Sequence, residues 1–213
     1  PASLLYGSDA VGGVLNFIGE RPAAQNTCQG DVQTNLYSNS LGESSSIGWK
    51  ASGEKAFCGI RLSQRSHADY LQGGGASLPN SRFSEQSLKT FAGANNQWGS
   101  FGLQAEVSQQ KLGLVEEEAL EAIDFRGRTP DIFYQRLNNR LVSSRNDLFL
   151  GCTKLELNAS FQQTELTDIG DVGFYELQMR LGTWLYEARL RLPSSASASY
   201  IVGWQGMHQT NRN

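Results

Sequence analysis

The feature that most constrains the fold is a period-two alternation of apolar and polar side chains, which recurs nine times along the chain. Its clearest instance places Phe101, Leu103 and Val107 on one side and Gln104 and Glu106 on the other. A repeat of two is the repeat of a β-strand, whose successive side chains point to opposite faces. The segments cover residues 31–36, 46–52, 58–63, 88–92, 101–108, 136–144, 154–162, 184–192 and 199–205. The pattern predicts an all-β chain of about nine antiparallel strands.

The connections between these segments alternate in length. The short connections are Ser52–Lys55, Asn95–Gln97, Asn146–Gly151 and Pro193–Ala196. The long connections are His67–Ser84, Gln110–Tyr134 and Gln163–Glu176. Transmembrane β-barrels have short turns on one side of the membrane and long loops on the other. The short link Ser40–Glu43 departs from this alternation, which otherwise favours a barrel.

The polar side of the strands carries charges in mid-strand. These charged residues are Lys50, Arg61, Lys89, Glu106, Glu156 and Arg189. A water-filled barrel lumen accommodates such charges, and so does the solvated face of a soluble sandwich. The mean hydropathy of -0.39 fits both folds, because barrel strands alternate and average to a hydrophilic value.

Composition and motifs exclude several classes of function. The formal net charge is -3 and no basic block is present, which argues against nucleic-acid binding. No G-x-S-x-G, H-E-x-x-H, Walker A or dinucleotide-binding motif occurs. We therefore expect no enzymatic activity, no catalytic residue, no resident metal and no cofactor.

The first nineteen residues read PASLLYGSDAVGGVLNFIG, with glycines and small residues between two short apolar pieces. From spacing alone, this is a helix–turn–strand corner of a mixed domain. The run also resembles the end of the plug domain of TonB-dependent outer-membrane receptors. The motif positions that carry the resemblance include Tyr6, Gly7, Ser8, Gly12, Gly13 and Asn16.

The resemblance implies two domains, the C-terminal end of a plug and its linker at 1–27 and the N-terminal part of a barrel at 28–213. Closed transporters of this type have about 22 strands around a plugged lumen, so the chain is expected to be a fragment of a partial transmembrane antiparallel barrel. The family lies in the bacterial outer membrane, contacts its lipid, and takes up a scarce nutrient such as an iron chelate, cobalamin or glycan. Energy comes through the TonB protein, which contacts a region N-terminal to this chain.

Strand parity gives candidate contacts between barrel and plug. On the face predicted to line the lumen, these candidates are Arg61, Glu106, Glu156 and Arg189. A soluble or surface-exposed β-rich binding module, such as an adhesin segment, remains an alternative. An outer-membrane enzyme barrel is a third, for which no convergent set of His, Ser and Asp residues is apparent.

Several other residues have both a plain and a functional interpretation. His67 and His208 are expected to be exposed or at a rim. The acidic run 116–124 has helical spacing and reads as a solvated insert in a long loop, or as a cation-attracting mouth. Glu165, Asp168 and Asp171 could hold Ca²⁺ but lack a full ligand set.

The three cysteines match no metal-binding spacing. Cys28, Cys58 and Cys152 are expected to be small buried or wall residues, with a Cys28–Cys58 bridge as the alternative. Aromatic residues could form the interfacial girdles of a barrel or the core of a soluble domain. They are Trp49, Trp98, Trp184, Tyr186, Tyr200 and Trp204.

Overall fold

The computed structural model describes residues 19–123, 126–170, 175–193, 198 and 200–213. Within them the chain forms one antiparallel sheet of nine strands, and the predicted all-β class is confirmed. The strands are β1 (Thr27–Tyr37), β2 (Gly42–Ser52), β3 (Ala56–His67), β4 (Phe83–Asn96), β5 (Gly99–Gly113), β6 (Tyr134–Leu150), β7 (Thr153–Ile169), β8 (Tyr175–Arg191) and β9 (Ile201–Arg212). A short helix, α2 (Glu117–Ala122), lies between β5 and β6.

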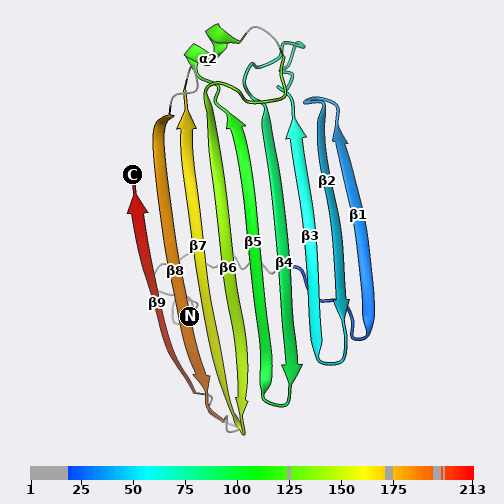
Figure 1. The fold of residues 1–213 in the computed structure, drawn as a ribbon, viewed down its shortest axis with the longest axis vertical. Helices are drawn as coiled ribbons and strands as arrows, with labels where there is room; N and C mark the ends of the chain where they lie inside the picture. The colour runs from blue at the N-terminus through cyan, green and yellow to red at the C-terminus, as the bar shows by residue number, and fades with distance from the viewer. Residues whose placement is uncertain (1–18, 124–125, 171–174, 194–197, 199) are drawn as a thin grey trace.

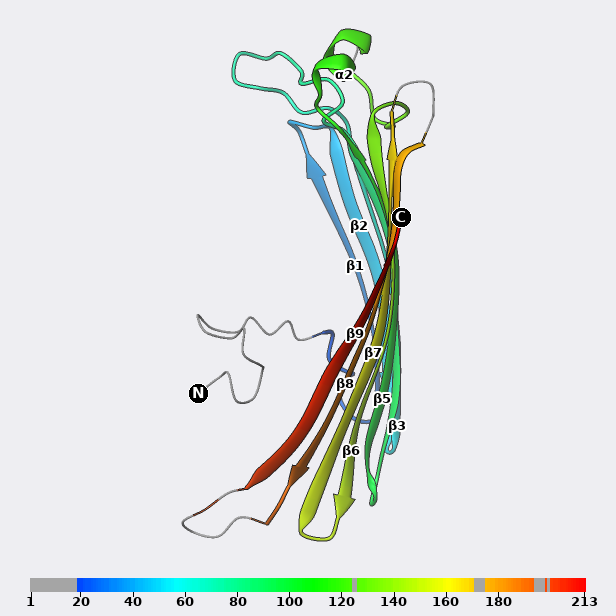
Figure 2. The same cartoon turned by 90° about the vertical axis from the view of Figure 1, so that its left-hand side faces the viewer.

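Each strand pairs with its neighbour in the chain, so the sheet is a simple meander with β1 and β9 as its two edges (Figure 1). The sheet is not closed on itself. Seen from the side it is twisted and bowed, and the segment that leads into β1 lies on its hollow side (Figure 2). The nine strands therefore form a curved single layer.

Several strands are longer than their alternation predicts. β7 continues to Ile169 and β8 begins at Tyr175, so the predicted long connection Gln163–Glu176 is wrong. β6 likewise continues to Leu150, and the predicted turn Asn146–Gly151 shrinks to two residues. The reason is that alternation marks only where one face is apolar, whereas the backbone ladder needs no apolar side chain.

At one end of the sheet, the connection between β8 and β9 spans residues 192–200 and is longer than the predicted short connection Pro193–Ala196. The other three turns at this end are short, as predicted. They comprise residues 53–55, 97–98 and 151–152. In the second of these, the Asn96 Oδ1 accepts hydrogen bonds from the amides of Trp98 (2.8 Å) and Gly99 (3.1 Å). Gly151 has φ +64°, a conformation that favours glycine.

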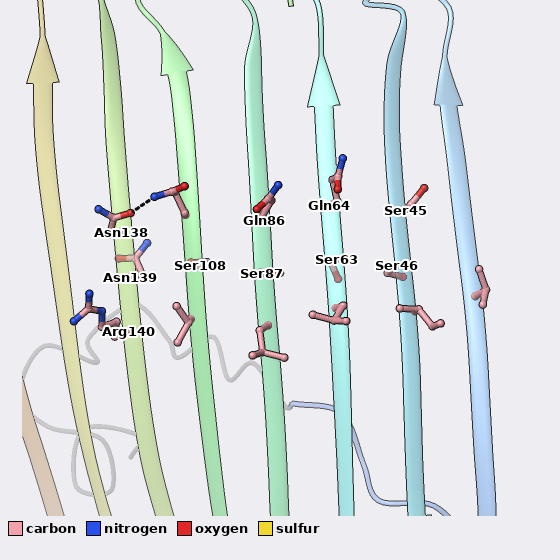
Figure 3. A pocket seen from close by; sticks show the side chains of 16 residues that line it. Ser45, Ser46, Ser63, Gln64, Gln86, Ser87, Ser108, Asn138, Asn139 and Arg140 are labelled. Carbon is pink, nitrogen blue, oxygen red and sulfur yellow. Dashed lines mark hydrogen bonds between the residues drawn. The ribbon is translucent and has the colours of Figure 1, made fainter. Parts of the chain in front are cut away.

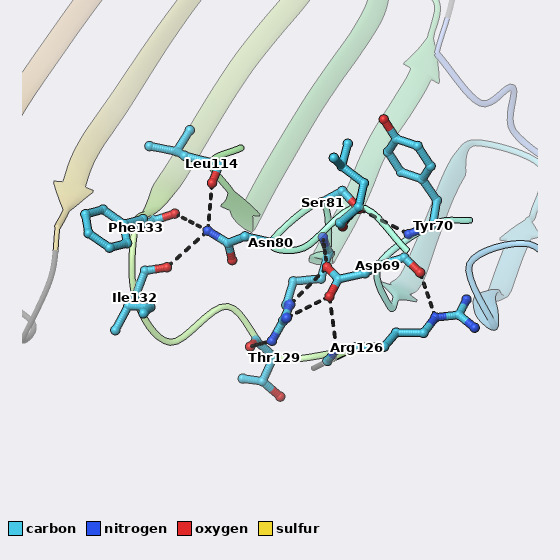
Figure 4. A network of polar contacts seen from close by, with 12 residues as sticks. Asp69, Tyr70, Asn80, Ser81, Leu114, Arg126, Thr129, Ile132 and Phe133 are labelled. Carbon is cyan, nitrogen blue, oxygen red and sulfur yellow. Dashed lines mark hydrogen bonds and ion pairs between the residues drawn. The ribbon is translucent and has the colours of Figure 1, made fainter. Parts of the chain in front are cut away.

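Two long connections at the other end fold onto each other, and we call their described residues, 68–82, 114–123 and 126–133, the loop cluster. The Asp69 carboxylate is fully buried at its centre. It accepts hydrogen bonds from the Arg82 side chain (Nη2–Oδ2 2.7 Å, Nε–Oδ1 3.0 Å), the Arg82 amide (3.0 Å) and the Gly127 amide (3.0 Å) (Figure 4). One carboxylate thus ties both loops together.

Asn80 and Arg128 extend this network. The buried Asn80 side chain donates to the carbonyls of Leu114 and Phe133, both at 2.8 Å (Figure 4). Arg128 donates to the carbonyls of Leu41 and Ser66. The loop cluster is therefore fixed to the ends of the strands, although it contains little regular structure.

The described residues form almost no apolar interior. The buried apolar residues are few, and none lies in the middle of a strand: they are Ala23, Ala68, Ala119, Ile123 and Ile169. The large apolar side chains of the strands are exposed instead, Val32 by 74% and Trp204 by 67%. A single layer of strands leaves both of its faces uncovered, so these side chains have no second layer to pack against.

Candidate functional site

The two faces of the sheet differ in chemistry. Residues directly opposite each other in an antiparallel pair share a face, so the register assigns each side chain. We call one side the apolar face. Its members include Val32, Leu36, Ile47, Trp49, Ile60, Leu62, Leu88, Leu103, Val107, Val142, Leu157, Phe161, Trp184, Tyr186, Leu190, Val202 and Trp204.

We call the other side the charged face. Among the described residues, the ion pairs that join two strands lie on this face, with Arg180–Glu165 on the apolar face as the exception. Over β6–β9 this face also carries an apolar patch. Its members are Leu137, Leu141, Leu166, Met179, Leu181, Leu185 and Met207.

All four residues predicted as plug contacts lie on the charged face. Glu106 forms an ion pair with Lys89 (3.2 Å). In the register, Lys89 of β4 lies between Arg61 of β3 and Glu106 of β5. Glu156 and Arg189 face each other across β7 and β8 near the short turns. The structure thus separates the four residues into two groups. Arg61 and Glu106 lie in the middle of the sheet, and Glu156 and Arg189 lie near the end with the short turns.

The segment before β1 lies against the charged face, and we call residues 19–26 the linker. Lys50 donates to the Arg21 carbonyl (3.2 Å), and Ser52 donates to the Ala23 carbonyl (2.9 Å). Ala23 is buried beneath these contacts. The linker is therefore fastened along β2 by side-chain donors before it turns into β1.

Arg61 joins this linker to the sheet. Its guanidinium binds Glu20 through Nε (2.8 Å) and Nη2 (3.0 Å). It also binds Asp31 of β1 through Nη1 (2.8 Å) and Nη2 (2.7 Å). The planar fork of arginine suits this double two-point contact, which a lysine could not reproduce.

A glycine makes this reach possible. In the register, Gly48 lies between Arg61 on β3 and Asp31 on β1. A Cβ at position 48 would lie 2.6 Å from the Arg61 Cζ and 2.8 Å from the Asp31 Oδ1. The arginine therefore crosses a strand over a position that only glycine leaves open.

The charges at this junction balance. Lys50 lies 3.3 Å from Glu20, so two carboxylates meet one guanidinium and one ammonium. The hydrogen bond from Arg61 holds the pKa of Glu20 below its usual value, against the opposing effect of partial burial. Glu20 is therefore ionised at neutral pH, and the junction is a partly solvated ionic contact.

A polar cavity of about 370 Å³ lies beside the junction. Its walls come from the linker and from β3–β5. The lining residues are Gly19, Glu20, Arg61, Ser63, Gln64, Arg65, Glu85, Ser87, Lys89 and Glu106. The arrangement brings the predicted Arg61 and Glu106 to one water-accessible space, and can bind polar groups or exchange ion-pair partners.

The remaining candidates lie elsewhere. His67 ends β3, and it is half-buried, with its ring stacked on Phe83 at 4.4 Å and its Nδ1 within 2.8 Å of the Ser40 Oγ. His208 lies inside β9 and is exposed. The acidic run does contain a helix, α2, on the outside of the loop cluster (Figure 1).

Geometry excludes the proposed disulfide. Cys28 and Cys58 both pair with Ala51, from opposite sides. They are therefore two strand spacings apart, about 9.5 Å, which exceeds the reach of a disulfide. All three cysteines are free and exposed, so the expectation that they are buried is wrong, while Cys28 and Cys58 do lie in strands of the sheet.

No metal cluster occurs among the described residues. Glu165 is engaged by Arg180 at 3.0 Å. Asp171 lies outside the described residues, as do the motif positions Tyr6, Gly7, Ser8, Gly12, Gly13 and Asn16. The domain boundary between 27 and 28, next to which β1 begins, stays a prediction.

Sequence reasoning missed Glu20, Asp31 and Lys50 as site residues. Asp31 and Arg61 were both in predicted strands. A glycine in the middle of a strand leaves room for a neighbouring side chain to pass over it, so Gly48 was the sequence signal that a side chain crosses β2. Glu20 stood in a segment that appeared to be a plain linker. The odd or even position of a residue along a strand predicts the face on which its side chain lies. It does not predict which other segment of the chain covers that face.

Comparison with known proteins adds no identity, because no family model, curated protein or solved structure matches the chain. Within the part of the chain that the structure describes, no helix has the length and apolarity needed to cross a membrane.

Proposed function

We propose that the chain is part of a TonB-dependent outer-membrane receptor, in which the sheet is a segment of a transmembrane barrel wall. The observation that carries the proposal is the contrast between the faces. One face exposes a band of large apolar side chains, and the other holds the linker through the ion pairs of Arg61. Lipid covers the first face, and the second lines a lumen that contains a plug.

The position of the apolar band supports a wall of tilted strands. The row that begins with Val32 is apolar as far as Val107 on β5, but it continues to Arg140, Gln163 and Thr210. On β6–β9 the apolar residues lie nearer the short turns. There the fully apolar row is Leu148, Leu155, Leu190 and Val202.

A flat lipid slab imposes such a shift on tilted strands. With a strand tilt of about 40° and a strand spacing of about 4.8 Å, the part of each strand that lies inside the slab shifts by roughly one residue from one strand to the next. Across eight neighbour steps this amounts to roughly eight residues, which matches the shift from the row of Val32 to the row of Val202. A soluble sheet has no need for this drift.

The charged face suits a plug that must move. A nutrient such as an iron chelate, a cobalamin or a glycan binds at the end bearing the loop cluster, and TonB supplies the energy that displaces the plug. The Glu20–Arg61 contact is partly solvated, so it can break and re-form without unfolding a core. Glu106, Glu156 and Arg189 are the further plug contacts, and the role proposed is transport without catalysis.

The native cysteines offer a direct test of this proposal. Cys28 and Cys58 lie on the apolar face, whereas Cys152 lies in a short turn. In the full-length protein in intact outer membranes, a charged maleimide should leave the first two unlabelled, while an apolar maleimide should reach them. Cys152 should react with the charged reagent once the periplasmic side is opened.

The alternative, a soluble or surface-exposed binding module, predicts a different result. All three thiols would then face water and react with the charged maleimide at similar rates. Labelling after denaturation in dodecyl sulfate controls for oxidised thiols. Equal labelling of Cys28, Cys58 and Cys152 in intact membranes would overturn the receptor proposal.

A further inference from the structure

The apolar face carries an unexpected concentration of positive charge beyond its apolar band, on β5–β9. We call this set the basic patch: Lys111, Arg136, Arg140, Arg180 and Arg212. All five lie between the apolar band and the end bearing the loop cluster. Among the described side chains on this face of β5–β9, the one carboxylate is Glu165, which binds Arg180.

Like charges stand directly opposite each other in this patch. Lys111 pairs in register with Arg136, and Arg180 pairs with Arg212. Direct cross-strand pairs of like charge destabilise a sheet. The Nε of Arg136 is also buried without a hydrogen-bond partner among the described residues. An anion bound between the cations would relieve these unfavourable features.

The neighbouring surface is amphipathic. A shallow hollow of about 900 Å³ lies on the same face, with Arg140 at its β6 end (Figure 3). Its lower wall is the apolar row from Val32 to Val107. Its upper wall carries amides and hydroxyls, namely Ser45, Gln64, Gln86, Gln109 and Asn138. The Gln109 Nε2 donates to the Asn138 Oδ1 at 2.9 Å, so the Asn138 Nδ2 is not used in this hydrogen bond.

We propose that the basic patch and the adjoining polar row bind the phosphate-bearing headgroup of an anionic lipid, whose acyl chains lie along the apolar band. The inference rests on the proposed transmembrane function. The occupant follows from charge complementarity with phosphate and from the apolar residues directly below, Val142, Phe161 and Trp184. The patch therefore holds specific lipids around this part of the wall.

Tryptophan fluorescence tests the proposal in the full-length protein reconstituted in phosphatidylcholine bilayers. Trp184 is exposed on the apolar face, below Arg180 on the same strand. Brominated acyl chains quench tryptophans that they contact, so competition between brominated phosphatidic acid and brominated phosphatidylcholine measures headgroup preference. One basic residue near a membrane contributes about 1 kcal/mol, so Arg140→Gln should lower that preference about five-fold.

The variants separate a specific site from general charge. Lys111→Gln/Arg136→Gln/Arg140→Gln should bring the two lipids to equal binding. Arg145→Gln removes one arginine from the charged face of the same strand and should leave the preference unchanged. Equal binding of both lipids by the unmodified protein, or an Arg145→Gln effect as large as that of Arg140→Gln, would overturn the proposal.

Two further outcomes identify the source of a failure. If excess inorganic phosphate displaces phosphatidic acid completely, the patch is a site for free anions and the lipid proposal falls. If neither brominated lipid quenches any tryptophan, the apolar face does not meet lipid, and the proposed membrane function falls with it. Quenching without headgroup preference removes the lipid site alone.

Discussion

The molecule contains two arginine–carboxylate clusters, one in the loop cluster that follows β3 and one where Arg61 of β3 meets the linker. They differ chiefly in their contact with water. In the loop cluster, Asp69 and Arg82 are 0% and 5% exposed. At the linker, the side chains of Glu20 and Arg61 are 30% and 23% exposed. A buried pair is costly to break because each partner would be left unpaired in a poor solvent for charge. A solvated pair opens at little cost.

The comparison separates structure from mechanism. In the loop cluster, a buried ion pair with four donors fixes two long loops beside a few buried apolar residues, Ala68, Ala119 and Ile123. The contact between Arg61 and the linker is also an arginine–carboxylate ion pair, but its side chains are partly exposed to water. This contact holds the linker and opens at little cost, which suits the moving plug of the function that we propose.

The largest effect is expected from Asp69→Ala. It leaves Arg82 buried without its carboxylate, which costs about 3–5 kcal/mol, and the loop cluster should open. Trypsin should then cut after Arg82, Arg126 or Arg128 at least about 100-fold faster than in the unmodified protein. Asp131→Ala, which alters an exposed carboxylate of the same cluster, is the matched control. Equal cleavage rates in both variants would contradict the role of Asp69.

A smaller effect is expected from Arg61→Gln. The partly solvated contact with Glu20 contributes about 1 kcal/mol, so the linker should lift from the sheet about five-fold more often. The readout is the rate of thiol labelling at the buried position 23, with Ala23→Cys introduced and the three native cysteines replaced by serine. Arg65→Gln removes the exposed partner of Glu85 and should leave that rate unchanged.

Gly48→Ala sharpens the comparison within the junction. The added Cβ would overlap the path of Arg61 toward Asp31, whereas the contact with Glu20 approaches from the linker. Labelling at position 23 should therefore rise less than in Arg61→Gln. A rise equal to that of Arg61→Gln would mean that the Asp31 contact is needed to hold the arginine toward the linker.

Much of this fold follows from alternation, because successive side chains of a strand point to opposite faces and here give the sheet one apolar face and one charged face. The same rule explains the errors. Alternation ends near Gln163 although β7 continues to Ile169, since on the apolar face the strand there carries the polar residues Gln163, Glu165 and Thr167. The Asp69–Arg82 pair stood in a predicted plain loop, and its buried contact depends on how the two loops fold together, which no local pattern encodes.

The smallest effect is expected from pH. Since Arg61 lowers the pKa of folded Glu20 beneath its usual value near 4.5, the stabilisation from this contact is fully present above about pH 4.5 and is lost as pH falls through the lowered pKa. Labelling at position 23 with a dipyridyl disulfide, which reacts in acid, should therefore stay constant down to pH 4.5 and rise below it. Glu20→Gln should label faster at neutral pH and lose this acid-dependent rise. If Glu20→Gln kept the full rise, another carboxylate would control the linker, and Asp31 would be the next residue to replace.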